Sequence, residues 1–185
     1  MVLLVNRRRG FTAIELLNFF ALATTLAAIG MYALTRYIRH SKTAEARESV
    51  TRLATGAAEF YNHSDATQPS EAAPQAVHAM RHFPATARTP VPEEALNVRG
   101  KKYQSNSMDW AVSPWKDLGF SIVQPQCYQY FFDAQGSGGS AHAQVVARGD
   151  LDGDGTRSKY SLTITPDESL TATVEKVIER SDPEE

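Results

Sequence analysis

The chain has 185 residues, of which 42% are hydrophobic and 22% charged, which excludes a wholly disordered protein and fits a single domain. The formal net charge is -2 and no basic run extends beyond Arg7–Arg9, which argues against a dedicated nucleic-acid-binding protein. The single cysteine, Cys127, excludes an internal disulfide. It lies in the apolar run 122–132, where we expect it to be buried.

The first predicted element is a membrane-spanning helix. Residues 11–35 contain one charged residue, Glu15, and as a helix they extend about 37 Å, enough to cross a hydrocarbon layer of about 30 Å. The cations Arg7–Arg9 before it predict a cytoplasmic N-terminus and an exported C-terminus. Three cations after it weaken this orientation, because they lie on the exported side: Arg36, Arg39 and Lys42. Residues 1–10 form a basic leader.

The helical pattern continues beyond the apolar run. Apolar residues recur at spacings of four, three, four and three, which keeps them on one face: Ala46, Val50, Leu53, Ala57 and Phe60. We therefore expect one continuous helix from about Phe11 to Asn62. Its first part, 11–35, is apolar throughout, and its second part, 36–62, is amphipathic.

A loop and a sheet are predicted to follow the helix. Residues 63–106 are rich in proline, alanine and serine, and predict a long connection with one short helix, Glu71–Arg81. Strand patterns occur within residues 107–180, ahead of a flexible tail at 181–185: Ile122–Asp133, Ala141–Gly149, Tyr160–Thr165 and Leu170–Ile178. The expected fold class is α+β, with the amphipathic half of a long N-terminal helix packed on an antiparallel sheet of three or four strands.

The start of the chain resembles a known export signal. Residues 7–17, RRRGFTAIELL, look like the prepilin-type signal of type IV pilins and of type II secretion pseudopilins. The resemblance implies the pilin roll and a membrane aspartyl peptidase that cuts between Gly10 and Phe11. The same enzyme then methylates the new amino group of Phe11, and Glu15 corresponds to the family's buried acid.

The resemblance also implies a location and a set of partners. We expect a single-pass inner-membrane protein that leaves the bilayer to enter an extracellular pilus or a periplasmic pseudopilus. Its partners would be the prepilin peptidase and methyltransferase, other pilin subunits and the inner-membrane assembly platform. Short segments are similar to pilin-like proteins of myxobacterial and related Gram-negative type: 82–84, 89–90, 100–103, 118–120 and 128–130.

Three functions are compatible with these features. The first hypothesis is a structural subunit of a type IV pilus, major or minor, with a role in adhesion or motility. The alternative is a pseudopilin for protein secretion. The lack of a cysteine pair near the C-terminus mildly favours a pseudopilin or a minor pilin over a major pilin. A membrane-anchored enzyme or sensor would need a catalytic cluster. The sequence presents none, so no enzymatic activity is expected.

Glu15 has two physical interpretations. A carboxylate in an apolar helix is costly and normally has a partner, and the amine of a neighbouring Phe11 would fix the axial register of a filament. Alternatively, Glu15 is an acid favoured by the helix dipole at the membrane surface. The helix departs from many pilins in lacking a central proline, leaving Gly30 as its weak point. Asn18 adds a polar group that either bonds a neighbouring helix or lies near the interface.

One candidate metal site is present in the second half of the chain. Asp150, Asp152 and Asp154, followed by Gly155, match the first half of a calcium loop. Ser161 stands where the bidentate glutamate of an EF-hand would be, so we expect a plain Asp/Gly hairpin, with Ca²⁺ as the alternative and no other cofactor.

Two further groups of residues have a functional and a structural interpretation. His78 and His82 have the spacing of zinc ligands but lack a third ligand, and we expect them to be solvated or capping residues. Four aromatic residues would form either an adhesive surface or, as we expect, part of the core: Trp110, Trp115, Tyr128 and Tyr130.

Overall fold

The computed structural model describes residues 10–64, 81–174 and 177–182. The chain divides into two compact units, Met1–Ile38 and Arg39–Glu185. Helix α1 (Ala13–His63) belongs to both units: its residues up to Ile38 lie in the first unit, and the rest form the first element of the second. The division lies close to the predicted end of the apolar run at residue 35.

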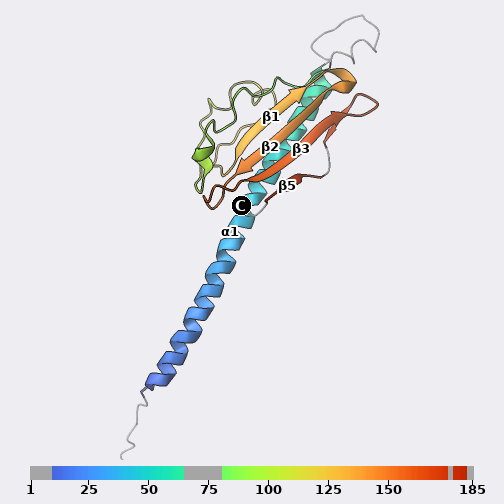
Figure 1. Ribbon diagram of the computed structural model, residues 1–185. Helices are drawn as coiled ribbons and strands as arrows, with labels where there is room; N and C mark the ends of the chain where they lie inside the picture. The colour runs from blue at the N-terminus through green and yellow to red at the C-terminus, as the bar shows by residue number, and fades with distance from the viewer. Residues whose placement is uncertain (1–9, 65–80, 175–176, 183–185) are drawn as a thin grey trace, which may run out of the picture. The chain divides into compact units, whose positions relative to one another are not determined.

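The second unit is built on the amphipathic half of α1. The residues that this half buries recur every three or four positions, as the sequence predicts: Thr43, Ala46, Ser49, Val50, Leu53, Ala54, Ala57, Ala58 and Tyr61. Within this unit the helix lies along one face of the sheet (Figure 1). Small side chains dominate the buried face, among them Ala46, Ala54, Ala57 and Ala58.

The sheet is antiparallel throughout and runs in the order β1-β2-β3-β4, with β5 also paired to β3. β3 is the longest strand, and β4 and β5 pair with successive halves of it, at Ile164–Pro166 and Lys159–Ser161. The strands are β1 (Gln129–Gln135), β2 (His142–Gly149), β3 (Ser158–Pro166), β4 (Ala172–Val174) and β5 (Glu179–Ser181). Two short 3₁₀ turns complete the elements: η2 (Ala95–Val98) and η3 (Gly138–Ser140).

These elements confirm the predicted α+β fold class. The core is continuous from α1 through the sheet to the loop 105–120, and it includes Cys127, as expected. The four aromatic residues considered for an adhesive surface belong to this core, each no more than 3% exposed. Trp110 meets Trp115 and Phe120 edge-on at ring centroid distances of 5.5 and 5.3 Å. The core interpretation of these aromatics is therefore confirmed.

The sheet differs from its prediction at both ends. The strand expected at Ile122–Asp133 begins only at Gln129, because the segment before it is held by loop contacts, among them a bridge between Gln126 and Tyr103. The strand expected at Leu170–Ile178 is shorter, because Leu170 has a φ of 58° and belongs to a turn. The short strand β5 was not expected. The predicted helix Glu71–Arg81 lies outside the described residues except for Arg81, which is not helical.

A glycine fixes the distance between α1 and the loop 110–120. A Cβ on Gly56 would clash with the carbonyl oxygen of Leu118. The helix therefore needs a residue without a side chain where it passes this loop.

Candidate functional site

The first unit consists of a helix whose side chains are uncovered. Every residue from Gly10 to Ile38 is exposed except Ala23, which is half-buried. Exposure is high even for large apolar side chains, such as Phe11 at 82% and Met31 at 72%. Within the described ranges, α1 is the one helix long and apolar enough to cross a membrane. A surface of this kind is stable only when lipid or protein covers it.

The hydroxyl groups along this helix are satisfied internally. Thr24, Thr25 and Thr35 donate to the carbonyl oxygens of Phe20, Ala21 and Met31, at distances of 2.8 to 2.9 Å. These bonds remove the desolvation penalty that a free hydroxyl would incur in an apolar environment. The threonines therefore leave the helix suited to hydrocarbon or to another apolar helix.

Glu15 is bound within the first turn of α1. Its Oε2 accepts hydrogen bonds from the Thr12 N–H at 2.7 Å and from the Thr12 hydroxyl at 2.8 Å. In return, the Glu15 N–H donates to the Thr12 hydroxyl oxygen at 3.4 Å. This reciprocal pair is a capping box, whose Thr-x-x-Glu spacing is visible in the sequence and was the signal that sequence reasoning missed. A local role at the helix start thus exists beside the predicted intermolecular one.

Glycine and phenylalanine of the predicted cleavage site lie just before this helix. Gly10 and Phe11 are exposed and precede the first residue of α1, Ala13. Apart from its chain neighbours, no atom of the described residues lies within 4 Å of a Cβ placed on Gly10. In the described structure the peptide bond between them is accessible, whereas the residues before Gly10 lie outside the described ranges.

The three aspartates of the candidate calcium loop do come together. One carboxylate oxygen from each of Asp150, Asp152 and Asp154 lies within 4.8 Å of the others. The loop connects β2 to β3, which pair from Gly149 and Ser158 onward, so the predicted hairpin is present.

These carboxylates already have partners. Asp150 accepts the N–H groups of Gly153 at 2.6 Å and Gly155 at 3.0 Å. Asp152 pairs with Arg39 at 3.1 Å, and Asp150 lies 3.5 Å from Arg99. Backbone N–H groups and guanidinium groups therefore act as partners of these carboxylates in the described loop. The choice between a plain turn and a calcium site stays a prediction.

Glu45, which sequence reasoning missed, joins α1 to the start of β1 and the segment before it through its carboxylate. Glu45 Oε1 accepts the backbone N–H of Cys127 at 2.9 Å and the hydroxyl of Tyr130 at 3.1 Å. Burial raises the pKa of Glu45, and these hydrogen bonds and the charge of Lys102 oppose the shift. No sequence spacing could reveal this contact, because Glu45 and Cys127 are 82 positions apart.

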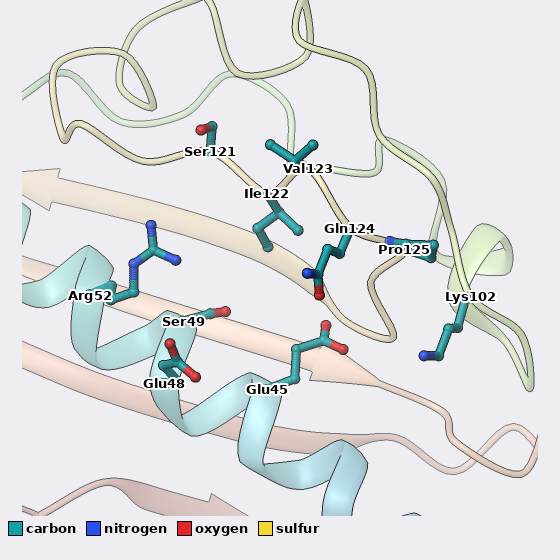
Figure 2. A pocket seen from close by; sticks show the side chains of 10 residues that line it. All are labelled: Glu45, Glu48, Ser49, Arg52, Lys102, Ser121, Ile122, Val123, Gln124 and Pro125. Atoms are coloured by element: carbon teal, nitrogen blue, oxygen red, sulfur yellow. The ribbon is translucent and has the colours of Figure 1, made fainter.

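Glu45 also lines an open groove of about 490 Å³ between α1 and residues 121–125. Figure 2 shows Glu45, Glu48 and Arg52 along the helix wall, with Lys102 pointing toward the helix from the opposite side. The groove is open to solvent, and its two acidic and two basic side chains balance in formal charge. Within the described residues, it presents neither a nucleophile–base pair nor a metal-ligand set.

Of the two histidines with the spacing of zinc ligands, the structure describes His82. His82 is exposed, and its ring packs edge-on against Phe60 at a centroid distance of 6.0 Å. His78 lies outside the described residues, so their predicted relation stays untested.

Comparison of the chain with models of protein families, with curated proteins and with solved structures finds no match in any of the three. Three features of the chain bear on its function: the exposed helix, the signal-like segment before it and the α+β fold.

Proposed function

We propose that the chain is a structural subunit of a type IV pilus, major or minor, that is processed after Gly10 and assembled through its N-terminal helix. The observation that carries this proposal is the uncovered apolar surface of α1 from Phe11 to Ile38, directly after the prepilin-like residues 7–10. A soluble protein does not leave such a surface in water. As a monomer, the subunit keeps this helix in the inner membrane.

Assembly then exchanges one apolar environment for another. When the subunit leaves the bilayer, contacts between α1 and lipid are replaced by contacts between the α1 helices of neighbouring subunits. The internally bonded threonines support this exchange, because Thr24, Thr25 and Thr35 need no polar partner in either environment. Glu15 pairs with the N-terminal amine of a neighbouring Phe11 and sets the axial register.

A pseudopilin of a type II secretion system is the second candidate. It uses the same processing and the same helix, and the chain has a single cysteine, Cys127, which is buried and cannot form the internal disulfide of many major pilins. The genes that neighbour the coding sequence would distinguish the two systems.

Mass spectrometry of the purified mature protein tests the proposal. Co-expression with an active prepilin peptidase should yield a chain that begins at Phe11 and carries one additional methyl group. Co-expression with an inactive peptidase should yield the full chain. Replacement Gly10→Val should block cleavage, whereas Gly30→Val, a matched change at another glycine with no neighbour within 4 Å, should leave it unaffected.

The contrary result is equally clear. A membrane-anchored enzyme or sensor would keep Met1 and its leader in the presence of active peptidase. An intact N-terminus on the protein from cells with active peptidase would therefore refute the pilin proposal.

A further inference from the structure

Basic side chains gather at the end of the second unit where its part of α1 begins. Arg39 and Lys42 belong to the helix, and the segment 99–102 adds Arg99, Lys101 and Lys102. The aspartate loop holds the two together: Gly100 donates its N–H to the Asp150 carbonyl oxygen at 2.8 Å, and Arg39 pairs with Asp152. We call these five cations the basic cluster.

The arginines and the lysines of the basic cluster differ in how they are compensated. Arg39 and Arg99 have carboxylate partners, Asp152 at 3.1 Å and Asp150 at 3.5 Å. Within the described part of the chain, none of the three lysines forms a salt bridge: Lys42, Lys101 and Lys102. Lys101 and Lys102 are exposed and Lys42 is half-buried, so all three ammonium groups can reach an external anion.

Lys42 and Lys102 lie near the same part of the second unit although they belong to different segments. Burial raises the pKa of the Cys127 thiol to about 11 and the charge of Glu45 adds to the shift, whereas Lys42 and Lys102 both oppose it. Two further carboxylates interact with the cluster. Asp154 lies near Arg39 and Arg99, and Glu45 lies near Lys102 and directs one oxygen to Cys127 and Tyr130. Four carboxylates thus face the five cations: Asp150, Asp152, Asp154 and Glu45. The cluster keeps one formal positive charge in excess, and its three lysines form no salt bridge within the described residues.

The place of the cluster in the sequence identifies its partner. The apolar run ends at Thr35, and Arg39 and Lys42 follow it by about 6 and 10 Å along a helix. Lipid headgroups occupy about 5–8 Å on either side of the hydrocarbon layer. Cations on the exported side also oppose the usual charge bias of membrane proteins. Arg39 lies at headgroup depth, and Lys42, which lies just beyond it, can extend its long side chain back to the headgroups. Lipid phosphates would therefore compensate both cations.

We propose that the basic cluster binds the phosphates of anionic lipid headgroups on the exported face of the membrane. This inference rests on the proposed membrane-anchored monomer. The paired arginines form a rigid base, and the three lysines are the headgroup contacts. The second unit is thereby held at a fixed depth until the helix is withdrawn, and the same contacts are lost on assembly.

Lysine labelling in lipid nanodiscs tests the inference on the mature full chain. A water-soluble amine-acetylating reagent is applied in nanodiscs of anionic phosphatidylglycerol or of zwitterionic phosphatidylcholine, and each lysine is quantified by mass spectrometry. A lysine near an anionic surface gains on the order of 1 kcal/mol, so we expect acetylation of Lys42, Lys101 and Lys102 to be about fivefold slower in phosphatidylglycerol. High salt should abolish the difference.

Lys116 provides the internal reference. It is exposed and belongs to the loop that contacts α1 at Gly56, about 25 Å further along the helix than Arg39. Its acetylation should be the same in both lipids. The double replacement Lys101→Gln/Lys102→Gln should restore faster labelling of Lys42 in phosphatidylglycerol, and Lys116→Gln should not.

Failure of the lipid-headgroup inference can be distinguished from failure of the pilin proposal. Equal labelling of the cluster in both lipids would overturn this inference and leave the pilin proposal intact. Protection that arises only in assembled filaments would overturn it in favour of acidic groups on a neighbouring subunit. A mature chain that fails to enter nanodiscs of either composition would refute both proposals, since it would show that α1 is not a membrane helix.

Discussion

The hydrogen bonds of Glu45 make its replacement a direct test of how α1 is fixed to the rest of the second unit. Replacement Glu45→Ala removes the acceptor for the Cys127 N–H and for the Tyr130 hydroxyl, which are 2.9 and 3.1 Å from Oε1. A buried donor without an acceptor costs about 1–3 kcal/mol. Because water can enter the open groove beside Glu45, we expect the free energy of unfolding to fall by about 2 kcal/mol rather than by twice that.

Two control variants separate the acceptor from the charge. Glu45→Gln keeps a carbonyl oxygen for the same two donors and removes the half-buried charge, so it should retain most of the stability. Glu48→Ala alters an exposed acid three residues further along the same helix, and its effect should stay within about 0.5 kcal/mol.

The pH dependence of the same variants gives an independent check. Burial raises the pKa of Glu45 above its ordinary value of 4.5, so the folded state binds its proton more tightly than the unfolded state. The stability that this proton contributes is complete below the unfolded pKa and is lost as the pH rises through the folded pKa. The stability of the natural chain relative to Glu45→Gln should therefore fall as the pH increases above about 4.5.

Tryptophan fluorescence during thermal unfolding in detergent measures these differences. Trp110 and Trp115 are buried in the second unit, so their emission reports on its unfolding. A loss of about 2 kcal/mol should lower the Tm by about 4–8 °C for a unit of this size. If Glu45→Gln were as unstable as Glu45→Ala at neutral pH, the acceptor argument would be wrong. An unaltered Tm for Glu45→Ala would show that neither hydrogen bond contributes.

Three further predictions concern the helix and the aspartate loop. Glu15→Gln should preserve the capping box but, like Glu15→Ala, permit membrane insertion and prevent filament incorporation; incorporation of the glutamine variant at normal levels would assign Glu15 to capping alone. Gly56→Ala should destabilise the second unit by about 1–3 kcal/mol in thermal unfolding, because the helix must move away from the loop it contacts. Gly30→Ala, which meets no neighbour, should raise helicity by circular dichroism instead. Replacing EDTA by Ca²⁺ should leave the Tm unchanged, because guanidinium and N–H groups already occupy the loop carboxylates; a rise in Tm would establish a calcium site.

The predictable parts of the fold are those that local periodicity specifies. The apolar spacing from Ala46 to Ala57 predicted the buried face of α1, and the alternation of Tyr160, Leu162 and Ile164 predicted β3. Both patterns indicate which face of a single helix or strand is buried. They require no knowledge of what lies across from it.

The parts that could not be predicted depend on contacts between distant segments. All three residues of β5, Glu179–Ser181, are exposed, and the strand is defined by its backbone pairing with β3. Residues 122–128 are apolar enough for a strand, yet the Cys127 N–H bonds Glu45 instead of a neighbouring strand. Glu45 itself lies in an ordinary helical pattern, and its role arises from a loop 82 positions away.

The polar groups of the apolar helix limit what can cover it. Its threonines bond their own backbone and Glu15 bonds Thr12, whereas within the described residues the Asn18 amide and the Tyr32 hydroxyl have no hydrogen-bond partner. Tyr32 lies near the end of the apolar run, where a phenol suits the membrane interface. Asn18 lies one turn after Glu15 on the same side of the helix. If the proposed filament forms, we expect a neighbouring subunit to offer polar groups near Glu15 and Asn18, and an apolar surface from there to Tyr32.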